Sequence, residues 1–434
     1  EYIPIFLQFF KMNQLINHNN SLRNTIERTD LTLLDAAIDL DSIDLVLREC
    51  LTIEEMREAG SFFTGQILAT ATVKAFPSAV TFDSIILDPT CGAGNLLIEC
   101  SRMLGVEKNL SSTLKKWGKV LWGFDIHESF IESTKLRLVI EALRRGVNKD
   151  CSIEDALSFF INIQVKDVLT LTKNDVSEVT HAILNPPFSI WPSPNKYYWK
   201  SGKINAAGIV FDHFLRIFPE GCFFSAILPD VLRSGSRYNL FRDFCSLKSD
   251  AICQIWGRFN KKTDVDVFIL SGKILDEENN KKIVWQESFG EYIPLSDNFE
   301  VRTGPLVAYR DPEVGPEYPY FHSKNTPSWQ IITQANERRK FNGTVISPPF
   351  IIIKRTSSPG DKYRATASLI DMNEMVAVEN HMIIIKPKSN SIGECKKLMK
   401  ILRSKSTNEF LNSRIRLRHL TVQVIKDIPL KKVS

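Results

Sequence analysis

The chain has 434 residues, enough for two or three domains with sizeable cores, and its 43% content of hydrophobic residues is ordinary for a globular protein. The net charge of +5 is too small to mark the whole chain as a polycation, so affinity for a polyanion has to come from local clusters. Eight cysteines lie scattered without a CxxC pair, which argues against a disulfide framework or a zinc site. No apolar run approaches eighteen residues, so we expect no membrane contact and a cytoplasmic protein.

Two patterns divide the first part of the chain. Residues 1–50 carry apolar side chains at helical spacing, which predicts an N-terminal helical segment; these are Leu31, Leu34, Ile38, Leu40, Ile43, Leu45 and Leu47. From residue 51 to 290, short apolar strands alternate with helical stretches. This alternation is typical of an α/β domain with a parallel sheet wrapped by crossover helices.

The stretch DPTCGAG, residues 88–94, lies between a predicted strand at 84–87 and a predicted helix at 96–104. Gly92 and Gly94 remove the Cβ atom where a ligand has to touch the backbone. The amides of the turn and the N-terminus of the helix form an electropositive cradle. Cradles of this kind bind nucleotides at the carboxyl end of a sheet.

Acidic residues follow the next two predicted strands. Asp125 closes the strand at 120–124, where a carboxylate can accept both hydroxyls of a ribose. It lies further from the glycines than the usual twenty or so residues, and the helix and loop expected at 105–119 account for the delay. Asp167 follows the strand at 161–165 and is a second candidate for the same site.

The stretch NPPF, residues 185–188, follows the predicted strand at 182–184. Two consecutive prolines stiffen the loop and offer no N–H donor, so the loop presents acceptors, which an amine substrate requires. The side-chain oxygen of Asn185 and the carbonyl of Pro186 can each accept a hydrogen from one amino group and orient its lone pair. Phe188 offers a flat face for a base removed from its stack.

The end of this domain changes character. Predicted strands at 251–256, 265–270 and 282–285 follow one another with short turns, so we expect the sheet to close with antiparallel strands. From residue 291 to 434, prolines and glycines interrupt the pattern, which indicates a separate α+β domain. Basic residues cluster there and can pair with phosphates; they are Lys354, Arg355, Lys362, Arg364, Arg414, Arg416, Arg418 and His419.

These motifs, in this order, resemble the N6-adenine DNA methyltransferases that use S-adenosyl-L-methionine. DPTCGAG is similar to the cofactor loop of that family and NPPF to its catalytic loop. GSFFTGQILA, residues 60–69, is similar to the family element GQFFTP, with Gly65 in place of the proline. VRTGPL at 301–306 and the tail at 414–430 resemble the regions with which family members find their DNA sequence.

The resemblance implies a Rossmann-like seven-stranded sheet, followed by a DNA target-recognition domain at 291–434. The implied catalytic residues are Asn185, Pro186, Pro187 and Phe188. The implied cofactor-binding residues are Phe63, Thr64, Asp88, Pro89, Cys91, Gly92, Gly94, Asn95, Asp125, Ile126, Asp167, Val168 and Asn185. The implied DNA-binding residues are Phe259, which would pack against a flipped base, and Arg302, Lys354, Arg355, Arg414, Arg416 and Arg418. No metal is implied.

The expected function is therefore methyl transfer from S-adenosyl-L-methionine to N6 of an adenine flipped out of double-stranded DNA. The base would stack between Phe188 and Phe259. The protein would be the modification component of a restriction-modification system, with a separately encoded restriction endonuclease as its partner. Two alternatives stay open: a protein-glutamine or RNA methyltransferase, whose amine would meet the same acceptors, and a modification subunit that needs a separate specificity subunit. A DNA-binding module without catalysis is a third, which the intact motifs disfavour.

Overall fold

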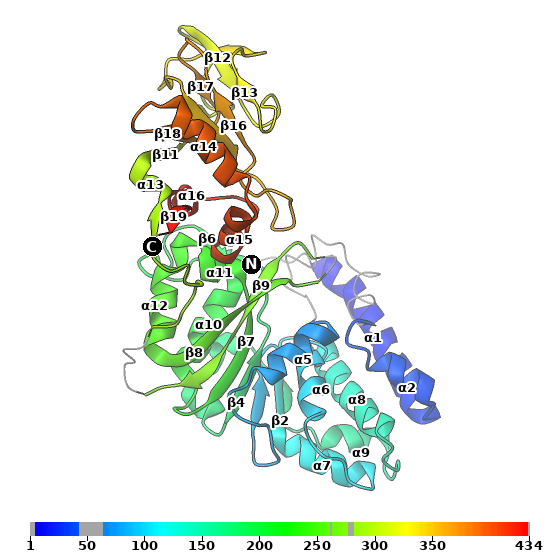
Figure 1. Cartoon of the computed structure of the whole chain (residues 1–434). Helices are drawn as coiled ribbons and strands as arrows, with labels where there is room; N and C mark the ends of the chain where they lie inside the picture. The colour runs from blue at the N-terminus through cyan, green and yellow to red at the C-terminus, as the bar shows by residue number, and fades with distance from the viewer. Residues whose placement is uncertain (1–4, 43–63, 261–262, 277–281, 433–434) are drawn as a thin grey trace. The chain divides into compact units, whose positions relative to one another are not determined.

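The computed structural model describes residues 5–42, 64–260, 263–276 and 282–432, with no account of the side chains of 5–14 and 431–432. The chain forms two compact units, Glu1–Trp285 and Gln286–Ser434 (Figure 1). The sequence analysis placed this boundary after residue 290 and set residues 1–50 apart from the catalytic domain. Phe63, Ile43, Leu45 and Leu47 lie outside the described residues.

A seven-stranded sheet forms the centre of the first unit, in the order β3-β2-β1-β4-β7-β9-β8. Strands β3, β2, β1, β4 and β7 pair in parallel, whereas β9 runs antiparallel to both β7 and β8. The strands are β1 (Ile86–Asp88), β2 (Leu121–Asp125), β3 (Ile163–Val165), β4 (His181–Leu184), β7 (Phe223–Pro229), β8 (Ser249–Arg258) and β9 (Asp266–Ile274). The predicted Rossmann-like sheet with an antiparallel end is confirmed.

One predicted strand is wrong. Residues 282–285 form no strand, although their sequence is apolar. Trp285 instead makes a T-shaped ring contact with Phe268, with 6.0 Å between ring centroids. An apolar run does not by itself supply a strand partner, and in this run Ile283 is buried and Trp285 half-buried, whereas Val284 is exposed.

Helices cover the sheet, as crossovers between parallel strands do (Figure 1). They are α5 (Gln66–Lys74), α6 (Asn95–Ser101), α7 (Leu110–Val120), α8 (Glu128–Arg144), α9 (Ile153–Ser158), α10 (Ala206–Ile217), α11 (Asp230–Ser234) and α12 (Asn239–Lys248). Between β4 and α10 lies a small hairpin of β5 (Ile190–Pro192) and β6 (Lys203–Asn205). All residues of β4 are buried, as expected for a strand covered on both faces.

The N-terminal helices α1 (Ile5–Arg28) and α2 (Leu31–Ala37) pack on α8. Asp30 begins α2 by accepting the backbone N–H of Leu33 at 3.1 Å. Asn19 donates to the carbonyl of Ser129 at 3.0 Å, and Arg23 forms an ion pair with Glu132 at 2.8 Å. These contacts make the N-terminal helices part of the first unit.

The second unit combines three small sheets with helices. A five-stranded sheet has the order β11-β18-β15-β16-β13, and β14-β12-β17 and β10-β19 form the other two. The strands are β10 (Tyr292–Pro294), β11 (Phe299–Thr303), β12 (Glu317–Phe321), β13 (Ile331–Ile332), β14 (Arg338–Lys340), β15 (Phe350–Lys354), β16 (Ala367–Ile370), β17 (Ala377–Val378), β18 (Met382–Pro387) and β19 (Pro429–Lys432). The helices are α13 (Leu295–Asn298), α14 (Ile392–Leu402), α15 (Lys405–Arg414) and α16 (Val422–Lys426).

The five-stranded sheet carries a core on each face. In β15, Ile351 and Ile353 belong to one apolar cluster, while Phe350 and Ile352 belong to the other. This follows from the alternation of side chains along a strand. Among the residues that the structure describes, no helix is long and apolar enough to cross a bilayer, and no group of three or more His, Cys, Asp or Glu could hold a metal ion.

Candidate cofactor and catalytic site

Loops at the carboxyl ends of the central strands enclose a cavity of about 320 Å³. Open α/β sheets place their ligands at this edge, and the volume suits a small organic molecule. The lining residues are Thr64, Asp88, Pro89, Thr90, Cys91, Gly92, Asn95, Leu96, Asp125, Ile126, His127, Phe130, Asp167, Val168, Leu169, Asn185, Pro187, Trp191 and Val210. Of the described residues expected to bind a cofactor, every one except Gly94 lies in this lining.

The two glycines of the turn after β1 have different surroundings. Both adopt the left-handed backbone conformation, with φ of 52° at Gly92 and 82° at Gly94. Glycine reaches this region without the steric cost that other residues meet. A Cβ atom on Gly94 would lie 2.7 Å from Cγ2 of Thr134 on α8. Gly92 therefore lines the cavity, whereas Gly94, expected to face the ligand, allows the turn to pack against α8.

Two carboxyl groups stand at the ends of neighbouring strands. Asp125 accepts the backbone N–H of Gly92 at 3.1 Å and of His127 at 2.9 Å, and Asp88 accepts that of Thr90 at 3.1 Å. Burial raises the pKa of Asp88 to about 8, and the negative charge of Asp125 adds to the rise. Burial also raises the pKa of Asp125. A ligand that brings positive charge or hydroxyl donors would favour the ionised form of both groups.

The lining of the cavity also combines a third acid with apolar side chains. Asp167 is exposed and accepts the backbone N–H of Leu169 at 3.0 Å, which begins a short 3-10 helix. Ile126 is 60% exposed although it is apolar, and Phe130 completes this wall. A flat ring with an amine at its edge would match an apolar wall that carries one acceptor.

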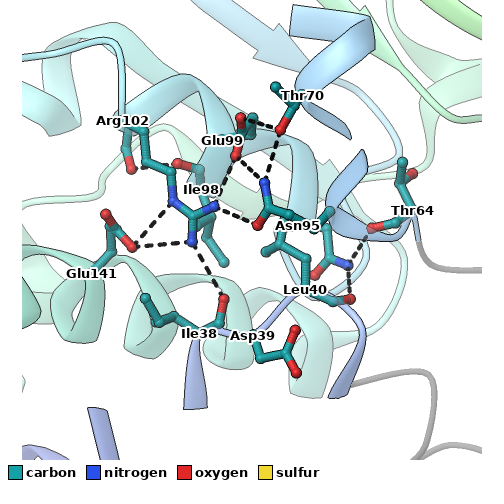
Figure 2. Close-up of polar contacts among 12 residues, drawn as sticks. Ile38, Asp39, Leu40, Thr64, Thr70, Asn95, Ile98, Glu99, Arg102 and Glu141 are labelled. Carbon is teal, nitrogen blue, oxygen red and sulfur yellow. Dashed lines mark hydrogen bonds and ion pairs between the residues drawn. The ribbon is translucent and has the colours of Figure 1, made fainter. Parts of the chain in front are cut away.

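Hydrogen bonds connect the NPPF loop to the segment before α5. The amide nitrogen of Asn185 donates to the Thr64 hydroxyl at 3.0 Å. The amide nitrogen of Asn95 donates to the carbonyls of Thr64 and Leu40, both at 2.8 Å (Figure 2). Thr64 is 1% exposed and Asn95 is 3% exposed. Because the two bonds of Asn95 are buried and the Asn185–Thr64 bond is partly buried, they hold Thr64 and Asn185 at a defined position beside the cavity.

A second layer of polar contacts lies behind Asn95 (Figure 2). Arg102 binds Glu99 at 2.8 Å and Glu141 at 3.4 Å, and Glu141 is buried on α8. Arg137, also buried, donates to the side-chain oxygen of Asn95 and to the carbonyl of Ala93, both at 2.6 Å. The layer joins α6 and α8 and fixes the first turn of α6.

Gly65 stands where the resembling family has proline, and the structure shows what occupies that space. Its backbone has φ −68° and ψ 164°, which a proline could adopt. A Cβ atom there would lie 2.3 Å from Oδ1 of Asp41. The carboxylate of Asp41 therefore occupies the place of a side chain at residue 65.

The NPPF loop contributes Asn185 and Pro187 to the cavity lining, whereas Pro186 and Phe188 are buried and do not line the cavity. The ring of Phe188 meets that of Phe259 edge to face, at 82° and 5.4 Å between centroids. Rings in direct contact leave no gap for a base between them. The sandwich expected from the sequence is therefore not present, and a base stacked between these rings would have to separate them.

With this geometry in place, the comparisons identify the first unit. Residues 45–207 match the family model described as N-6 DNA Methylase. The chain carries an N-6 DNA methylase domain. This is a domain of DNA adenine methyltransferases, and the matched residues include both the glycine turn and the NPPF loop. No curated protein matches the sequence.

Solved structures of restriction-modification proteins are similar to the chain. The type IIL restriction-modification enzyme MmeI in complex with DNA is 11% identical, with a TM-score of 0.52 over 88% of this chain and 69% of that one. This similarity shows a shared fold. The type IIG restriction endonuclease BpuSI is 14% identical, with a TM-score of 0.42 over 97% and 70% of the two chains. A modification subunit of a type I enzyme from Vibrio vulnificus YJ016 is 14% identical, with a TM-score of 0.37 over 55% and 50%.

Sequence reasoning missed seven lining residues of the methylase domain: Thr90, Leu96, His127, Phe130, Leu169, Trp191 and Val210. Four of them lie within two residues of a predicted site residue, so their position next to the motifs was the signal available. Phe130, Trp191 and Val210 had no such signal. They reach the cavity from α8, β5 and α10, whose packing the sequence pattern does not specify.

The predicted DNA-binding arginines and lysines differ in exposure and in the contacts that they make. Arg302 and Arg418 are exposed, while Lys354, Arg355 and Arg416 are half-buried. Arg414, by contrast, packs its guanidinium over the rings of Phe289 and Phe410, at 5.5 and 5.2 Å, and binds the side chain of Gln286. These contacts are made within the second unit, and the assignment of the half-buried Arg414 to a DNA-facing surface stays a prediction.

Arg364, expected in a basic surface cluster, is buried and donates to the carbonyl of Leu417 at 2.8 Å. A surface cluster forms elsewhere, where Arg355, His381, Arg418 and His419 come together. Burial lowers the pKa of His419, and the positive charges of Arg355, His381 and Arg418 lower it further. Mutual repulsion of this kind marks a site where an anion would be stabilised.

Proposed function

We propose that this protein transfers a methyl group from S-adenosyl-L-methionine to N6 of an adenine flipped out of double-stranded DNA, at a sequence chosen by its second unit. It would act as the modification component of a restriction-modification system, beside a separately encoded restriction endonuclease. The observation that carries the proposal is the position of Asn185. It stands at the edge of a cavity formed by the cofactor loop and is held there by Thr64.

The cavity fits the chemistry of this cofactor. Asp125, at the end of β2, is the candidate acceptor for the ribose hydroxyls, and Asp167 is the candidate partner of the adenine amine beside the wall of Ile126 and Phe130. Asp88 and Asp125, whose pKa values burial raises, suit a ligand with positive charge. When bound, S-adenosyl-L-methionine supplies an electrophilic methyl group.

Asn185 and Pro186 would orient the substrate amine. The nitrogen end of the Asn185 amide is turned to Thr64, so the oxygen end is the one that would meet the amine of the target adenine. The Pro186 carbonyl would accept the second hydrogen. Two acceptors on one amine localise its lone pair and direct it toward the methyl group. Asn185 would therefore be a positioning group, and the reaction would not need a strong base.

The second unit would provide the DNA affinity. Arg302 and Arg418 are exposed, and the half-buried Arg355 adds its positive charge close to that of Arg418, beside His419. Such groups bind phosphates with an affinity that falls as salt rises. The choice of sequence would come from other side chains of this unit, because phosphate contacts carry no sequence information.

The test is to sequence DNA from cells that express the protein with a method that detects modified bases, and to digest the same DNA for mass spectrometry of its nucleosides. We expect N6-methyladenine at one recurring sequence with the wild-type protein, and none with Asn185→Ala. Unmodified DNA in both strains, or label from S-adenosyl-L-methionine found on cytosine, RNA or protein glutamine, would overturn the proposal.

A further inference from the structure

The hairpin of β5 and β6 leaves the catalytic loop directly. It begins two residues after Phe188, and Trp191 on β5 lines the cavity. Asn205, at the end of β6, donates from its side chain to the carbonyl of Phe188 at 3.1 Å. The backbone N–H of Ala206 binds the carbonyl of Ser189 at 2.8 Å. Both ends of the hairpin are therefore fixed to the loop that carries Asn185.

The tip of the hairpin is held in one shape. The guanidinium of Arg237 donates to four backbone carbonyls, those of Trp199 at 2.8 Å, Lys200 at 3.2 Å, Ser201 at 2.6 Å and Lys203 at 3.0 Å. Trp199 is 3% exposed and anchors the tip by packing on the ring of Phe241. A loop that a single arginine fastens at four points presents its remaining side chains rigidly.

The turn that carries Tyr197 is ordered by a side chain of its own. The side-chain oxygen of Asn195 accepts the backbone N–H of Tyr197 at 3.0 Å and of Tyr198 at 3.2 Å. The hydroxyl of Tyr198 then donates to Asp212 at 2.7 Å, which directs that ring to α10. Its neighbour Tyr197 is left 95% exposed. One tyrosine of the pair anchors the turn, and the other projects from it.

The hairpin surface is both basic and apolar. Lys196, Lys200 and Lys203 are exposed, and no acidic residue occurs between positions 189 and 211. Ile190 is 57% exposed beside this charge. A cluster of lysines attracts phosphates, and an exposed ring on a rigid support can stack on a base or enter a base step. The combination fits distorted duplex DNA better than a protein partner, because the apolar side chains are few and surrounded by cations.

We propose that this hairpin is the element that opens the duplex at the target adenine, with Tyr197 stacking into the base stack and Lys196, Lys200 and Lys203 holding the backbone on either side. The inference rests on the proposed function. It adds the residues that compensate for the stacking lost when the target adenine leaves the duplex. Tyr197 acts on the DNA next to the target, outside the cavity. Its effect therefore depends on how firmly the target adenine is paired.

The test compares Tyr197→Ala with Ile252→Ala, which removes a side chain that is 74% exposed on β8 of the same unit. The substrates are two synthetic duplexes that carry the methylated sequence mapped in cells. One is fully paired, and the other has an abasic site opposite the target adenine. On the paired duplex, we expect Tyr197→Ala to slow methyl transfer about tenfold or more, and Tyr197→Trp to retain most activity. On the abasic duplex, Tyr197→Ala should match the wild type.

The lysines are tested by charge-matched pairs. Lys196→Gln with Lys203→Gln should lower the salt dependence of DNA binding by about two counterions, whereas Lys115→Gln with Lys119→Gln on α7 should not change it. Cofactor affinity, measured by calorimetry, should stay unchanged in every variant.

Each other outcome is decisive. Equal rates for Tyr197→Ala and wild type on the paired duplex overturn the inference, and so does a Tyr197→Ala defect of the same size on both duplexes. A wild-type protein that methylates neither duplex overturns the proposed function instead, so the two failures can be told apart.

Discussion

The side-chain amide of Asn185 donates to the hydroxyl of Thr64 across 3.0 Å, and so joins the NPPF loop to the segment that precedes α5. The bond decides which end of the amide faces Thr64. Thr64 is itself positioned by Asn95, the first residue of α6, through a 2.8 Å bond to its carbonyl. The orientation of Asn185, the proposed substrate acceptor, thus depends on contacts from two other segments of the chain.

The first prediction concerns this bond. Thr64→Val keeps the shape of the side chain but removes the hydroxyl, so the Asn185 amide loses the partner that orients it. We expect kcat to fall about tenfold or more, with a small change in DNA affinity. Thr64→Ser, which keeps the hydroxyl, should restore most of the rate in single-turnover assays. A valine variant as fast as the wild type would show that the bond does not orient the amide.

The second prediction separates orientation from binding. Asn185→Ala should reduce methyl transfer by about 10²-fold or more, because the amine loses an acceptor that matters chiefly in the transition state. Cofactor affinity should change little. Asn185→Asp keeps an acceptor of similar shape and should retain part of the activity. The assay is transfer of labelled methyl groups to duplex DNA, and loss of cofactor binding in Asn185→Ala would contradict the assigned role.

The third prediction uses the pKa of Asp88. Burial raises that pKa to about 8, so the carboxyl is protonated at neutral pH in the protein without cofactor. A positively charged ligand favours the ionised form, so binding should release a proton. Affinity for S-adenosyl-L-methionine should therefore rise between about pH 6 and pH 8.

Calorimetry in buffers of different ionisation enthalpy measures this proton release directly. Asp88→Asn, which cannot titrate, should show less release and a flatter dependence on pH. Equal proton release in the wild type and Asp88→Asn would assign the titration to another group.

The fourth prediction concerns the packing of the glycine turn. Gly94→Ala places a Cβ atom 2.7 Å from Thr134 in a left-handed conformation, and should lower the free energy of unfolding by about 2 kcal/mol or more. Gly146 is the matched control, because its φ is also positive, 85°, but nothing lies within 4 Å of the added atom. Gly146→Ala should cost only about 1 kcal/mol.

Urea unfolding of the two variants measures the difference. Adding Thr134→Ala should recover part of the loss in Gly94→Ala and none in Gly146→Ala. Equal losses for the two glycines would mean that backbone conformation, and not contact with Thr134, explains Gly94.

The fifth prediction concerns the basic cluster of the second unit. Arg355→Gln with Arg418→Gln should weaken DNA binding and reduce its salt dependence by about two counterions, uniformly across sequences. Lys396→Gln with Lys397→Gln on α14 removes equal charge from another exposed surface and serves as control. Fluorescence anisotropy at several salt concentrations gives both slopes. If the two double variants show the same dependence of DNA affinity on salt, the DNA does not contact Arg355 and Arg418.

The sequence was informative about the site where the position of a residue follows from the local structure around it. Strand ends carry Asp88, Asp125 and Asn185 because parallel strands bring their carboxyl ends to one edge, so the cavity could be expected from order alone. The edge-to-face contact between the rings of Phe188 and Phe259 could not be expected from the sequence, because it depends on how the β8–β9 hairpin folds back.

The basic residues show the same limit. The pattern that groups Arg414 with Arg416 and Arg418 counts charges along the chain, but Arg414 lies at the end of α15 with its guanidinium over two rings of its own unit. The sequence shows which residues are charged, whereas the packing of the folded chain determines what each charged group contacts.

The buried arginine of α8 has a practical consequence for anyone who shortens this protein. Arg137 donates to the carbonyl of Ala37 at 3.3 Å, and burial lowers its pKa to about 9. Removing residues 1–50 would leave that cation without two of its acceptors, the carbonyls of Ala37 and Asp39, and would also release Asn95 from Leu40. Breaking the surroundings of a buried charge is costly. A shortened enzyme would lose stability at α8, so a recombinant enzyme intended for use as a DNA-labelling reagent should retain its N-terminal helices.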